Sequence, residues 1–396
     1  MAKKSVDDVN FKGLRTFIRC DFNVPLKDGE ITNDLRIVNA LPTIKKVIAD
    51  GGKVILASHL GRPKGERKSE FSLAPVAARL SEYLGQEVSL QQDCIGANVE
   101  AAVSALEDGQ VTLLENVRFH AAETSKDKGE FDAFVSEFAK LADIFVLDAF
   151  GTAHRAQASV VGLADHVEAV CGYLLAKELE YFAKVLEAPD KPVVAILGGA
   201  KVSDKIQLIR NMLDKVDKVI VGGGMAYTFQ YGSGRKIGKS LLEKDFVDLA
   251  QELLVEAKQK GVELILPVDT VIGDDFSADA NTQVCADDIP DEWEGLDVGP
   301  KSVELFKNAI SDAKVVVWNG PLGVFELEPF SHGTRGVAEC LAELDATTII
   351  GGGDTATAIA KFGLADKVSH VSTGGGASLE LLEGKVLPGV ACLTDK

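Results

Sequence analysis

Arginine side chains recur directly after apolar segments in the first half of this 396-residue chain. The sequences at these places are "RCDFN", "SHLGR", "ENVRF" and "DAFGTAHR", which contribute His59, Arg62, Arg118, His154 and Arg155, and Arg36 follows the first loop. A guanidinium presents a planar fork of donors that pairs bidentately with carboxylate or phosphate. The set is therefore suited to a small, highly charged anion.

Glycine takes the corresponding places in the second half of the chain. The runs are "LGGAK", "VGGGM", "WNGPLG", "GGGDT" and "STGGG". Glycine lets the backbone approach a ligand closely and turn N–H groups toward it, often at a helix N-terminus where the dipole favours anions. One such run is explained by the steric needs of a strand-to-helix turn, but five at strand ends favour a site for a nucleotide polyphosphate.

Two lysines and two carboxylates accompany the glycine runs. "GGAKVSDKI" places Lys201 and Lys205 four residues apart, on one face if a helix starts there, and a polyanion between them would offset their repulsion. Asp354 in "GGGDT" is a candidate partner for Mg²⁺, which usually takes one or two carboxylates together with nucleotide phosphates. Glu326 in "GPLGVFE" can accept hydrogen bonds from ribose hydroxyls.

Two familiar nucleotide-binding patterns fail on inspection. "SGRKIGKS", residues 233–240, resembles a P-loop, but Ser233 replaces its first glycine and the segment follows the helical pattern "MAYTFQY" instead of a strand. We interpret it as a surface loop. No strand end carries G-x-G-x-x-G with an acidic residue about twenty positions later, which argues against a dinucleotide site.

The stretch "RCDFNVP", residues 19–25, has one polar and one apolar face. In an extended chain Arg19, Asp21 and Asn23 lie on one side, and Cys20, Phe22 and Val24 on the other. Taken alone, the pattern is typical of a half-exposed edge strand with solvated charges. The alternative is that its polar face belongs to a binding site.

The elements that must position these residues alternate in type along the chain. Short apolar runs such as "TFIRCDF", "KVILAS", "VVAIL" and "KVVVWNG" are separated by longer segments of helical period. Near-continuous apolar strands require a parallel sheet covered by helices on both faces. The pattern predicts an α/β protein with two doubly wound parallel sheets, and ligands of such sheets bind beyond the carboxyl ends of the strands.

The order of the segments predicts two domains joined by a helix, with a hinge and a central cleft. Residues 172–192 have helical spacing, end near Pro189, and lie between the two groups of strands. We expect a substrate domain at 1–171 and a nucleotide domain at 193–376. Residues 377–396 are too short for another βα unit and are expected to fold back onto either domain, with a return to the first as one option.

Composition limits the classes of partner. A net charge of −18 argues against nucleic acid or an anionic membrane as the main partner. The six cysteines are scattered without zinc-like spacing, and predict reduced, mostly buried thiols. No signal-like or membrane-length apolar run is present, which predicts a cytoplasmic protein.

Read together, the motifs resemble those of the phosphoglycerate kinase family, in that family's order and across nearly the whole chain. They are "RCDFNVP", "SHLGRPKG", "ENVRF", "GTAHRA", "LGGAKVSDK", "WNGPLGVFE", "GGGDT" and "STGGGAS". The resemblance implies reversible phosphoryl transfer between 1,3-bisphosphoglycerate and ADP, giving 3-phosphoglycerate and ATP, with Mg²⁺ as the Mg–nucleotide complex. It also implies a role in glycolysis or carbon fixation and a cytosolic monomer.

The resemblance also implies roles for single positions. The substrate-binding positions are Asp21, Asn23, Arg36, His59, Arg62, Arg118 and Arg155. The nucleotide-binding positions are Gly199, Ala200, Lys201, Lys205, Gly223, Gly295, Asn319, Pro321, Gly323, Val324, Glu326, Gly352, Gly353, Asp354 and Thr355, with Asp354 meeting the nucleotide-bound Mg²⁺. The positions around the transferring phosphoryl are Arg36, Lys201, Lys205, Gly374 and Gly375.

Two further points concern single residues. Arg19 is expected to brace neighbouring carboxylates, which is an inference of our own. The family commonly has histidine where this chain has Gln157, a departure that bears on the hydrogen bonding of that loop. His120, His166, His332 and His370 lie outside the motifs, and we interpret them as structural or surface residues.

Phosphoryl transfer needs in-line alignment, neutralised oxygens and exclusion of water, so no enzyme base is required and hinge closure should precede transfer. Two other classes share parts of the pattern. A nicotinamide-dependent dehydrogenase would share the fold class. A two-domain anion-binding protein without catalysis would share the hinge and the arginines, but has no need of the lysine pair.

Overall fold

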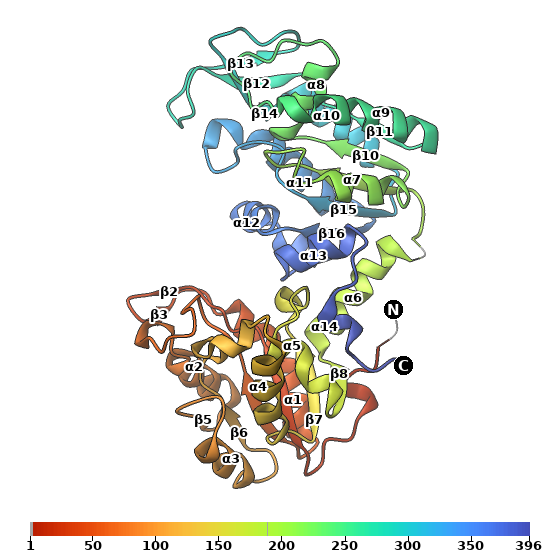
Figure 1. Ribbon diagram of the computed structural model, residues 1–396. Coiled ribbons are helices and arrows are strands. Elements are labelled where there is room, and N and C mark those ends of the chain that lie inside the picture. Colours follow the sequence, from red (N-terminus) through yellow and green to blue (C-terminus); the bar gives the residue numbers. More distant parts are fainter. Residues whose placement is uncertain (1–2, 188) are drawn as a thin grey trace. The chain divides into compact units, whose positions relative to one another are not determined.

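The computed structural model describes residues 3–187 and 189–396 and divides into two compact units (Figure 1). Unit 1 consists of Met1–Leu179 and Val386–Lys396, and unit 2 of Glu180–Lys385. Each unit contains a six-stranded parallel sheet. The predicted α/β class with two parallel sheets is therefore confirmed.

The sheet of unit 1 has the order β5-β6-β4-β1-β7-β8. Its strands are β1 (Arg15–Cys20), β4 (Lys53–Ala57), β5 (Val88–Leu90), β6 (Val111–Leu113), β7 (Ile144–Asp148) and β8 (Glu168–Cys171). β1 is central, since it pairs with β4 on one side and with β7 on the other. The edge-strand alternative for "RCDFNVP" is therefore wrong, and Arg19 is fully buried.

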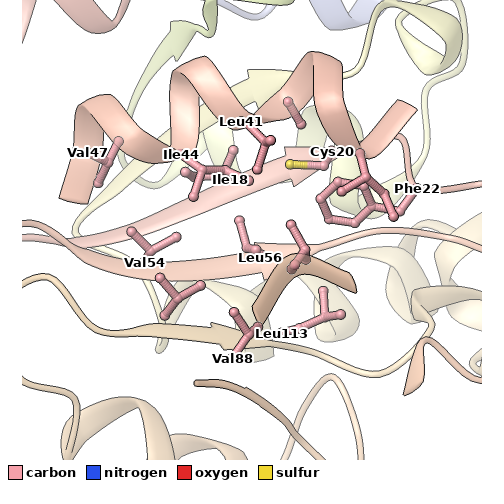
Figure 2. Packing of buried hydrophobic residues seen from close by; sticks show 14 of the residues in the cluster. Ile18, Cys20, Phe22, Leu41, Ile44, Val47, Val54, Leu56, Val88 and Leu113 are labelled. Carbon is pink, nitrogen blue, oxygen red and sulfur yellow. The ribbon is translucent and has the colours of Figure 1, made fainter. Parts of the chain in front are cut away.

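The core of unit 1 forms where helix α1 (Leu35–Ala49) packs on this sheet (Figure 2). Leu41, Ile44 and Val47 recur every three residues and so share one face of the helix. That face meets Ile18 of β1 and Leu56 of β4. Burial of each such side chain contributes about 1.5–3 kcal/mol, which fixes the sheet beneath the polar residues that follow β1.

Further helices complete unit 1. They are α2 (Ala74–Leu84), α3 (Ala97–Ser104), α4 (Lys128–Ala139), α5 (Ala158–Val161) and α14 (Pro388–Ala391), with the 3₁₀ turns η1 (Val6–Asp8), η2 (Ser69–Phe71), η3 (Val117–Phe119), η4 (Ala121–Thr124), η5 (Phe150–Thr152) and η6 (Gly162–Asp165). The turns η3, η4 and η5 follow β6 and β7. They carry the loops that contain Arg118 and Arg155.

The sheet of unit 2 has the order β11-β10-β9-β15-β16-β17. Its strands are β9 (Val193–Leu197), β10 (Lys218–Val221), β11 (Glu263–Ile265), β15 (Val315–Asn319), β16 (Thr347–Gly351) and β17 (His370–Val371). The helices are α7 (Ile206–Leu213), α8 (Met225–Gly232), α9 (Val247–Lys260), α10 (Pro300–Ile310), α11 (His332–Glu343), α12 (Gly353–Lys361) and α13 (Gly375–Leu382), with turns η7 (Lys244–Phe246), η8 (Glu328–Phe330) and η9 (Ala365–Lys367). The glycine runs follow the strands of this sheet.

Two small antiparallel sheets were not expected from the sequence. In unit 2, β12 (Thr270–Gly273), β13 (Thr282–Cys285) and β14 (Glu294–Val298) pair in the order β13-β12-β14, apart from the main sheet (Figure 1). In unit 1, β2 (Leu26–Lys27) pairs with β3 (Glu30–Ile31). Strand β13 is mostly exposed and β2 and β3 have two residues each, so neither carries the apolar run that reveals a buried strand.

The helix between the two groups of strands, α6, covers Tyr173–Leu186 and is shorter than the expected span of 172–192. Pro189 and Pro192 account for the difference, because a proline disfavours helical backbone at the residue before it. The two units divide within α6, after Leu179, instead of at its ends.

The C-terminal segment belongs to both units. Helix α13 lies in unit 2, whereas residues 386–396 lie in unit 1. There the amide of Gly389 donates to the carbonyl of Ala153 at 2.8 Å, and that of Thr394 to Ala169 at 2.9 Å. The end of the chain thus fastens the loop that follows β7.

Two features of the structure bear on the composition, namely the burial of the thiols and the character of the helices. All six cysteines are free, with Cys20, Cys94 and Cys171 buried and Cys285, Cys340 and Cys392 half-buried. Within residues 3–187 and 189–396, no helix combines the length and the apolar character that crossing a bilayer demands.

Candidate active site

The polar residues after β1 contact two other strand-end loops of unit 1. Asp21 forms an ion pair with Arg36, which lies in the first turn of α1. The Asn23 side-chain oxygen accepts a hydrogen bond from the amide of Gly61 at 2.8 Å. The carbonyl of Gly61 in turn accepts from Nη1 of Arg118 at 2.8 Å. Gly61 therefore joins the loops after β1, β4 and β6.

Gly61 fits this place because it has no side chain. Its φ of +62° lies in the left-handed region, and a Cβ there would overlap the ring of Phe71. A bulkier residue would displace the loop that carries the neighbouring Arg62.

Three of the predicted arginines line one hollow of about 590 Å³ in unit 1. Its lining consists of Arg62, Lys64, Gly65, Arg118, His120, Ala121, Thr124, Arg155 and Gln157. We call it the arginine hollow. The sequence did not single out Lys64 or Thr124, although the basic "RPKG" that contains Lys64 was a usable signal.

His59 lies behind these arginines and is held by Arg19. Nη2 of Arg19 lies 3.2 Å from Nδ1 of His59 and Nε donates to Ser159 Oγ at 2.8 Å. Because a guanidinium is only a donor, Nδ1 of His59 accepts and its proton sits on Nε2. Burial, reinforced by Arg19, Arg118 and Arg155, lowers the pKa of His59 well below its ordinary value. His59 is therefore neutral.

The expected bracing of carboxylates by Arg19 is partly indirect. Arg19 bonds Ser159, the Cys20 carbonyl and His59, and the Ser159 hydroxyl donates to Glu123 at 2.6 Å. Glu123 is fully buried and so balances the charge of Arg19 through this serine. The network fixes His59 at the sheet edge.

Charge in the arginine hollow is concentrated and incompletely paired. Burial, together with repulsion from Arg19 and Arg155, lowers the pKa of Arg118 to about 10. Arg118 still carries its charge at neutral pH, and its Nε is buried without a hydrogen-bond partner, as is Oε1 of Gln157. A bound anion would both satisfy the donor and reduce the repulsion among the cations.

In unit 2 the lysine pair does not lie on one helical turn as expected. Helix α7 begins only at Ile206. Before it, Ser203 donates from its amide and hydroxyl to Glu243 at 3.0 and 2.6 Å, which holds residues 203–205 in a turn. Lys201 is exposed, whereas Lys205 is half-buried and bonds Oδ1 of Asn319. Burial lowers the pKa of Lys205.

Most of the predicted nucleotide positions line a second hollow of about 550 Å³ in unit 2, which we call the glycine hollow. The predicted positions in its lining are Gly199, Ala200, Gly223, Gly295, Pro321, Gly323, Val324, Glu326 and Asp354. Gly295 allows Tyr227 to pack against the backbone, because a Cβ at position 295 would overlap the Tyr227 hydroxyl. Backbone and small residues therefore shape this wall, as the glycine runs suggested.

The other predicted positions lie outside the lining of the glycine hollow. Gly353 and Gly375 begin α12 and α13, and an ideal Cβ on Gly375 would lie 3.4 Å from the Gly353 amide, so the two N-termini are adjacent. Helix N-termini favour phosphate. The Thr355 hydroxyl is buried and accepts from the amide of Gly320 at 2.7 Å, so this side chain has a structural partner.

Sequence reasoning missed the apolar wall of the glycine hollow. Tyr227, Leu241, Phe276 and Leu296 line it, and Leu241 and Phe276 are 58% and 60% exposed. Large exposed apolar side chains beside a concave surface suit the flat face of a base. The one available signal was Phe276 in the polar segment "DDFSADAN".

The P-loop-like segment is a surface feature, as interpreted. Residues 233–240 form turns after α8, and Lys239 pairs with Glu292 at 2.6 Å. Both side chains are more than half exposed. They do not line the glycine hollow.

Comparison with known proteins decides the family. The sequence model of the family described as phosphoglycerate kinase matches residues 6–385. The chain belongs to the phosphoglycerate kinase family. It is 56% identical over 399 residues to the phosphoglycerate kinase of Clostridium novyi (strain NT) and over 401 residues to that of Thermosipho africanus (strain TCF52B), covering 100% of this chain and 99% of each relative.

Solved structures of phosphoglycerate kinases have the same fold. The enzyme from Coxiella burnetii matches with a TM-score of 0.90 at 47% identity, and that from Pyrococcus horikoshii OT3 with 0.83 at 32%, each over 98% of both chains. The resemblance drawn from the motifs is confirmed, and the dehydrogenase alternative is wrong. The individual site positions stay predictions.

Proposed function

We propose that this chain transfers a phosphoryl group reversibly between the acyl phosphate of 1,3-bisphosphoglycerate and ADP, giving 3-phosphoglycerate and ATP. It is a phosphotransferase with a carboxyl group as acceptor, and this is a reaction of glycolysis. The observation that carries the proposal is the 56% identity over the full length of two relatives named phosphoglycerate kinase.

The phosphoglycerate binds in unit 1, within residues 1–171. Arg62, Arg118 and Arg155 of the arginine hollow hold its phosphate through charge-assisted hydrogen bonds. Asp21 and Asn23 face the hydroxyl and carboxylate end. The unpaired Nε of Arg118 supports this proposal, because a buried donor without a partner costs free energy until an anion arrives.

His59 acts as a neutral hydrogen-bond donor toward the phosphoglycerate. Arg19 occupies Nδ1, which leaves Nε2–H free to face an anion. Since the ring is neutral, its contribution does not depend on protonation near pH 7. Charge compensation of the substrate falls to the arginines.

The nucleotide binds in unit 2, within residues 193–376. The base lies against the apolar wall formed by Leu241, Phe276 and Leu296, and the ribose reaches Glu326. The phosphates reach the N-termini of α12 and α13 and the ammonium of Lys205. The substrate is the Mg–nucleotide complex, and exposed Asp354, in the first turn of α12, supplies a carboxylate for its Mg²⁺.

Transfer requires alignment and neutralisation of charge in place of a covalent intermediate. Arg36, Lys201, Lys205 and the backbone amides of Gly374 and Gly375 surround the phosphoryl group in flight, where they stabilise its equatorial oxygens. Arg36 first exchanges its ion pair with Asp21 for the phosphoryl oxygens. No side chain has to accept a proton, because the attacking carboxylate or ADP phosphate is already ionised.

Closure about α6 brings the two substrates together. The residues proposed for the two substrates belong to different compact units, and the boundary between the units falls within this helix. Closure also excludes water, which would otherwise compete with the acceptor for the phosphoryl group.

A coupled assay tests the function. The purified chain is mixed with 3-phosphoglycerate, ATP and Mg²⁺, and an excess of glyceraldehyde-3-phosphate dehydrogenase reports 1,3-bisphosphoglycerate through the loss of NADH absorbance. We expect turnover that stops when 3-phosphoglycerate is left out or EDTA is added. Absence of turnover with a folded protein would favour the non-catalytic anion-binding alternative.

Arg36→Ala in the same assay tests the role of the phosphoryl-facing arginine. Loss of one well-placed electrostatic donor lowers kcat by roughly 10²–10³. Arg15→Ala is the matched control, since Arg15 lies at the start of β1 and pairs with Asp143. A raised KM with unchanged kcat for Arg36→Ala would contradict the assigned role.

A further inference from the structure

Three side chains of metal-binding type meet at the edge of the arginine hollow, where His120 lines the hollow but none of the three is among the residues proposed to bind phosphoglycerate. Asp93 and Cys94 lie in the loop between β5 and α3, and His120 lies between η3 and η4. One ligand atom from each of the three lies within 4.8 Å of the others. Among the described residues this is the one such group of histidine, cysteine and carboxylate side chains.

We propose that Asp93, Cys94 and His120 bind a thiophilic divalent cation, with Zn²⁺ as the biological ion. Zinc takes thiolate, imidazole and carboxylate ligands together, whereas Mg²⁺ and Ca²⁺ prefer oxygen alone. The donor set therefore distinguishes this ion from the Mg²⁺ that accompanies the nucleotide.

Two of the three ligands, Asp93 and His120, are already held near the spacing that a tetrahedral ion needs, and the Cys94 sulfur lies within 4.8 Å of both. His120 Nε2 lies 2.6 Å from Asp93 Oδ1, and the amide of Cys94 donates to the same oxygen at 2.7 Å. Two ligands of a tetrahedral zinc ion lie about 3.3 Å apart, given bonds of roughly 2.0 Å. Opening the Asp93–His120 pair by about 0.7 Å would thus admit the ion between the two ligand atoms, as the proton of their hydrogen bond leaves Nε2 and, by way of solvent, Nδ1 of His120 takes one up.

Neighbouring side chains restrict the orientation of Asp93 and His120. Arg67 pairs with Oδ2 of Asp93 at 3.7 Å, which leaves Oδ1 directed toward His120. The His120 ring lies against Phe134 with centroids 5.2 Å apart, so packing limits its rotation. These contacts position two of the three ligands before an ion arrives.

Binding must release a proton from the thiol. Cys94 is fully buried, and this burial raises the pKa of its thiol well above the ordinary value. The free protein therefore holds a neutral thiol, and the ion binds as the S–H bond breaks and the proton leaves to solvent. His120 binds through Nε2 as neutral imidazole with its proton on Nδ1.

The ion reaches the site from the side of Asp93. Asp93 lines a surface hollow of about 750 Å³, whereas Cys94 closes the inner side of the group. Three protein ligands leave the fourth position to water. Sites with an open position exchange their ion more readily than closed sites with four protein ligands, so we expect reversible binding.

Cobalt is the probe, because Co²⁺ adopts zinc geometry and a thiolate ligand gives it a near-ultraviolet charge-transfer band. The reduced full-length protein is titrated with Co²⁺, and Zn²⁺ is then added. We expect one equivalent of Co²⁺ to produce the thiolate band and the visible bands of tetrahedral cobalt, and Zn²⁺ to abolish both.

Variants show which residues bind the ion. Cys94→Ser should lose the charge-transfer band, and His120→Gln and Asp93→Asn should each weaken Co²⁺ binding at least tenfold. Cys340→Ser, on α11, and His332→Gln are matched controls that should retain wild-type binding. Circular dichroism checks that every variant is folded.

Each outcome of these titrations either supports the proposed metal site or overturns it. No thiolate band in the wild-type protein, or the same band and affinity in folded Cys94→Ser and His120→Gln, would overturn the proposal. If Cys94→Ser fails to fold because this side chain is buried, half-exposed His120 and Asp93 still decide it. Activity plays no part in the readout, so the result is independent of the catalytic assignments.

Discussion

Arg19 has a structural role in unit 1 that differs from the role proposed for the arginines that line the arginine hollow. Arg19 is fully buried, and its charge is balanced through Ser159 by Glu123. It fixes the tautomer of His59 and leaves Arg62, Arg118 and Arg155 to line the arginine hollow. A structural arginine and the arginines proposed to bind phosphoglycerate thus occupy neighbouring strand ends.

The lysines of unit 2 give a residue-scale prediction. Lys201→Ala should lower kcat by roughly 10²–10³, because this ammonium would meet the phosphoryl group in flight. Lys239→Ala should leave kcat within a few-fold of wild type, since Lys239 pairs with Glu292 on the surface. Steady-state kinetics on both variants shows which of the two lysines acts on the phosphoryl group. An inactive Lys239→Ala variant would contradict the surface-loop interpretation of residues 233–240 and favour a P-loop.

Asp148 predicts a dependence of stability on pH. This carboxyl is buried at the end of β7, which raises its pKa from 3.8 to about 7. Between these two values the folded protein binds more protons than the unfolded chain, so the free energy of unfolding falls as pH rises, by up to about 1.4 kcal/mol per pH unit. Above the folded-state pKa of about 7, the contribution of Asp148 to the free energy of unfolding is fully lost.

Asp148→Asn should remove the part of the fall in unfolding free energy with rising pH that this carboxyl causes. Urea unfolding followed by circular dichroism from pH 5 to 8 is expected to show a smaller decline in the variant than in the wild-type protein. Asp132→Asn, on the surface of α4, should keep the wild-type profile. Parallel profiles for Asp148→Asn and wild type would show that this carboxyl ionises normally in the folded protein.

At this scale the sequence indicated the charged lining of the arginine hollow better than the apolar lining of the glycine hollow. Arg62, Arg118 and Arg155 were predictable because an arginine at a strand end has few structural explanations. Leu241 and Phe276 were not, because a leucine or phenylalanine in a loop is usually interpreted as packing. The Asp93, Cys94 and His120 group depends on contact between distant loops, which spacing along the chain does not show.

At the scale of elements, the loops after β9 and β15 depend on glycine for their close approach. A Cβ on Gly320 would overlap the carbonyl oxygen of Gly198, and Gly320 has a φ of +99°. The amide of Gly320 is held by the hydroxyl of Thr355. These contacts connect β9, β15 and α12 beside the glycine hollow.

Gly320→Ala should therefore lower the free energy of unfolding by roughly 2 kcal/mol or more. Alanine would be strained at the positive φ of this position, and its Cβ would overlap the carbonyl oxygen of Gly198. Gly353→Ala is the matched change, since its Cβ would meet open space and alanine favours the first turn of α12. Differential scanning calorimetry should show a lower Tm for Gly320→Ala alone. Equal values would contradict the packing described here.

The elements themselves were predictable to different degrees. The long apolar strands, such as β9 and β15, were visible because burial on both faces requires continuous apolar sequence. The helix start that would have put Lys201 and Lys205 on one face is not met, since α7 begins at Ile206 and the hydrogen bonds from Ser203 to Glu243, which come from tertiary structure, hold the preceding residues in a turn. The β12–β14 sheet lacked a signal because β13 is mostly exposed, and because the buried strands β12 (TVIG) and β14 (EGLDV) are short and interrupted by polar residues and glycine.

At the scale of the whole molecule, we expect a domain closure that needs both substrates. Each ligand shifts a conformational equilibrium only by its differential affinity for the two states, and each contacts mainly one unit. Small-angle scattering should show the largest decrease in radius of gyration with 3-phosphoglycerate and Mg–nucleotide together. An unchanged radius in the saturated ternary complex would rule out large-scale closure.

Each unit is proposed to bind one substrate, and isothermal titration calorimetry on one variant of each unit tests this division. Arg155→Ala should weaken 3-phosphoglycerate binding by roughly 10-fold or more, a loss of at least about 1.4 kcal/mol, and leave Mg–ADP binding unchanged. Asp354→Asn should weaken Mg–ADP and leave 3-phosphoglycerate unchanged. If either folded variant instead weakened binding of the other unit's ligand to a similar extent, or if the wild-type protein bound neither ligand, the proposed division of binding between the units would be wrong.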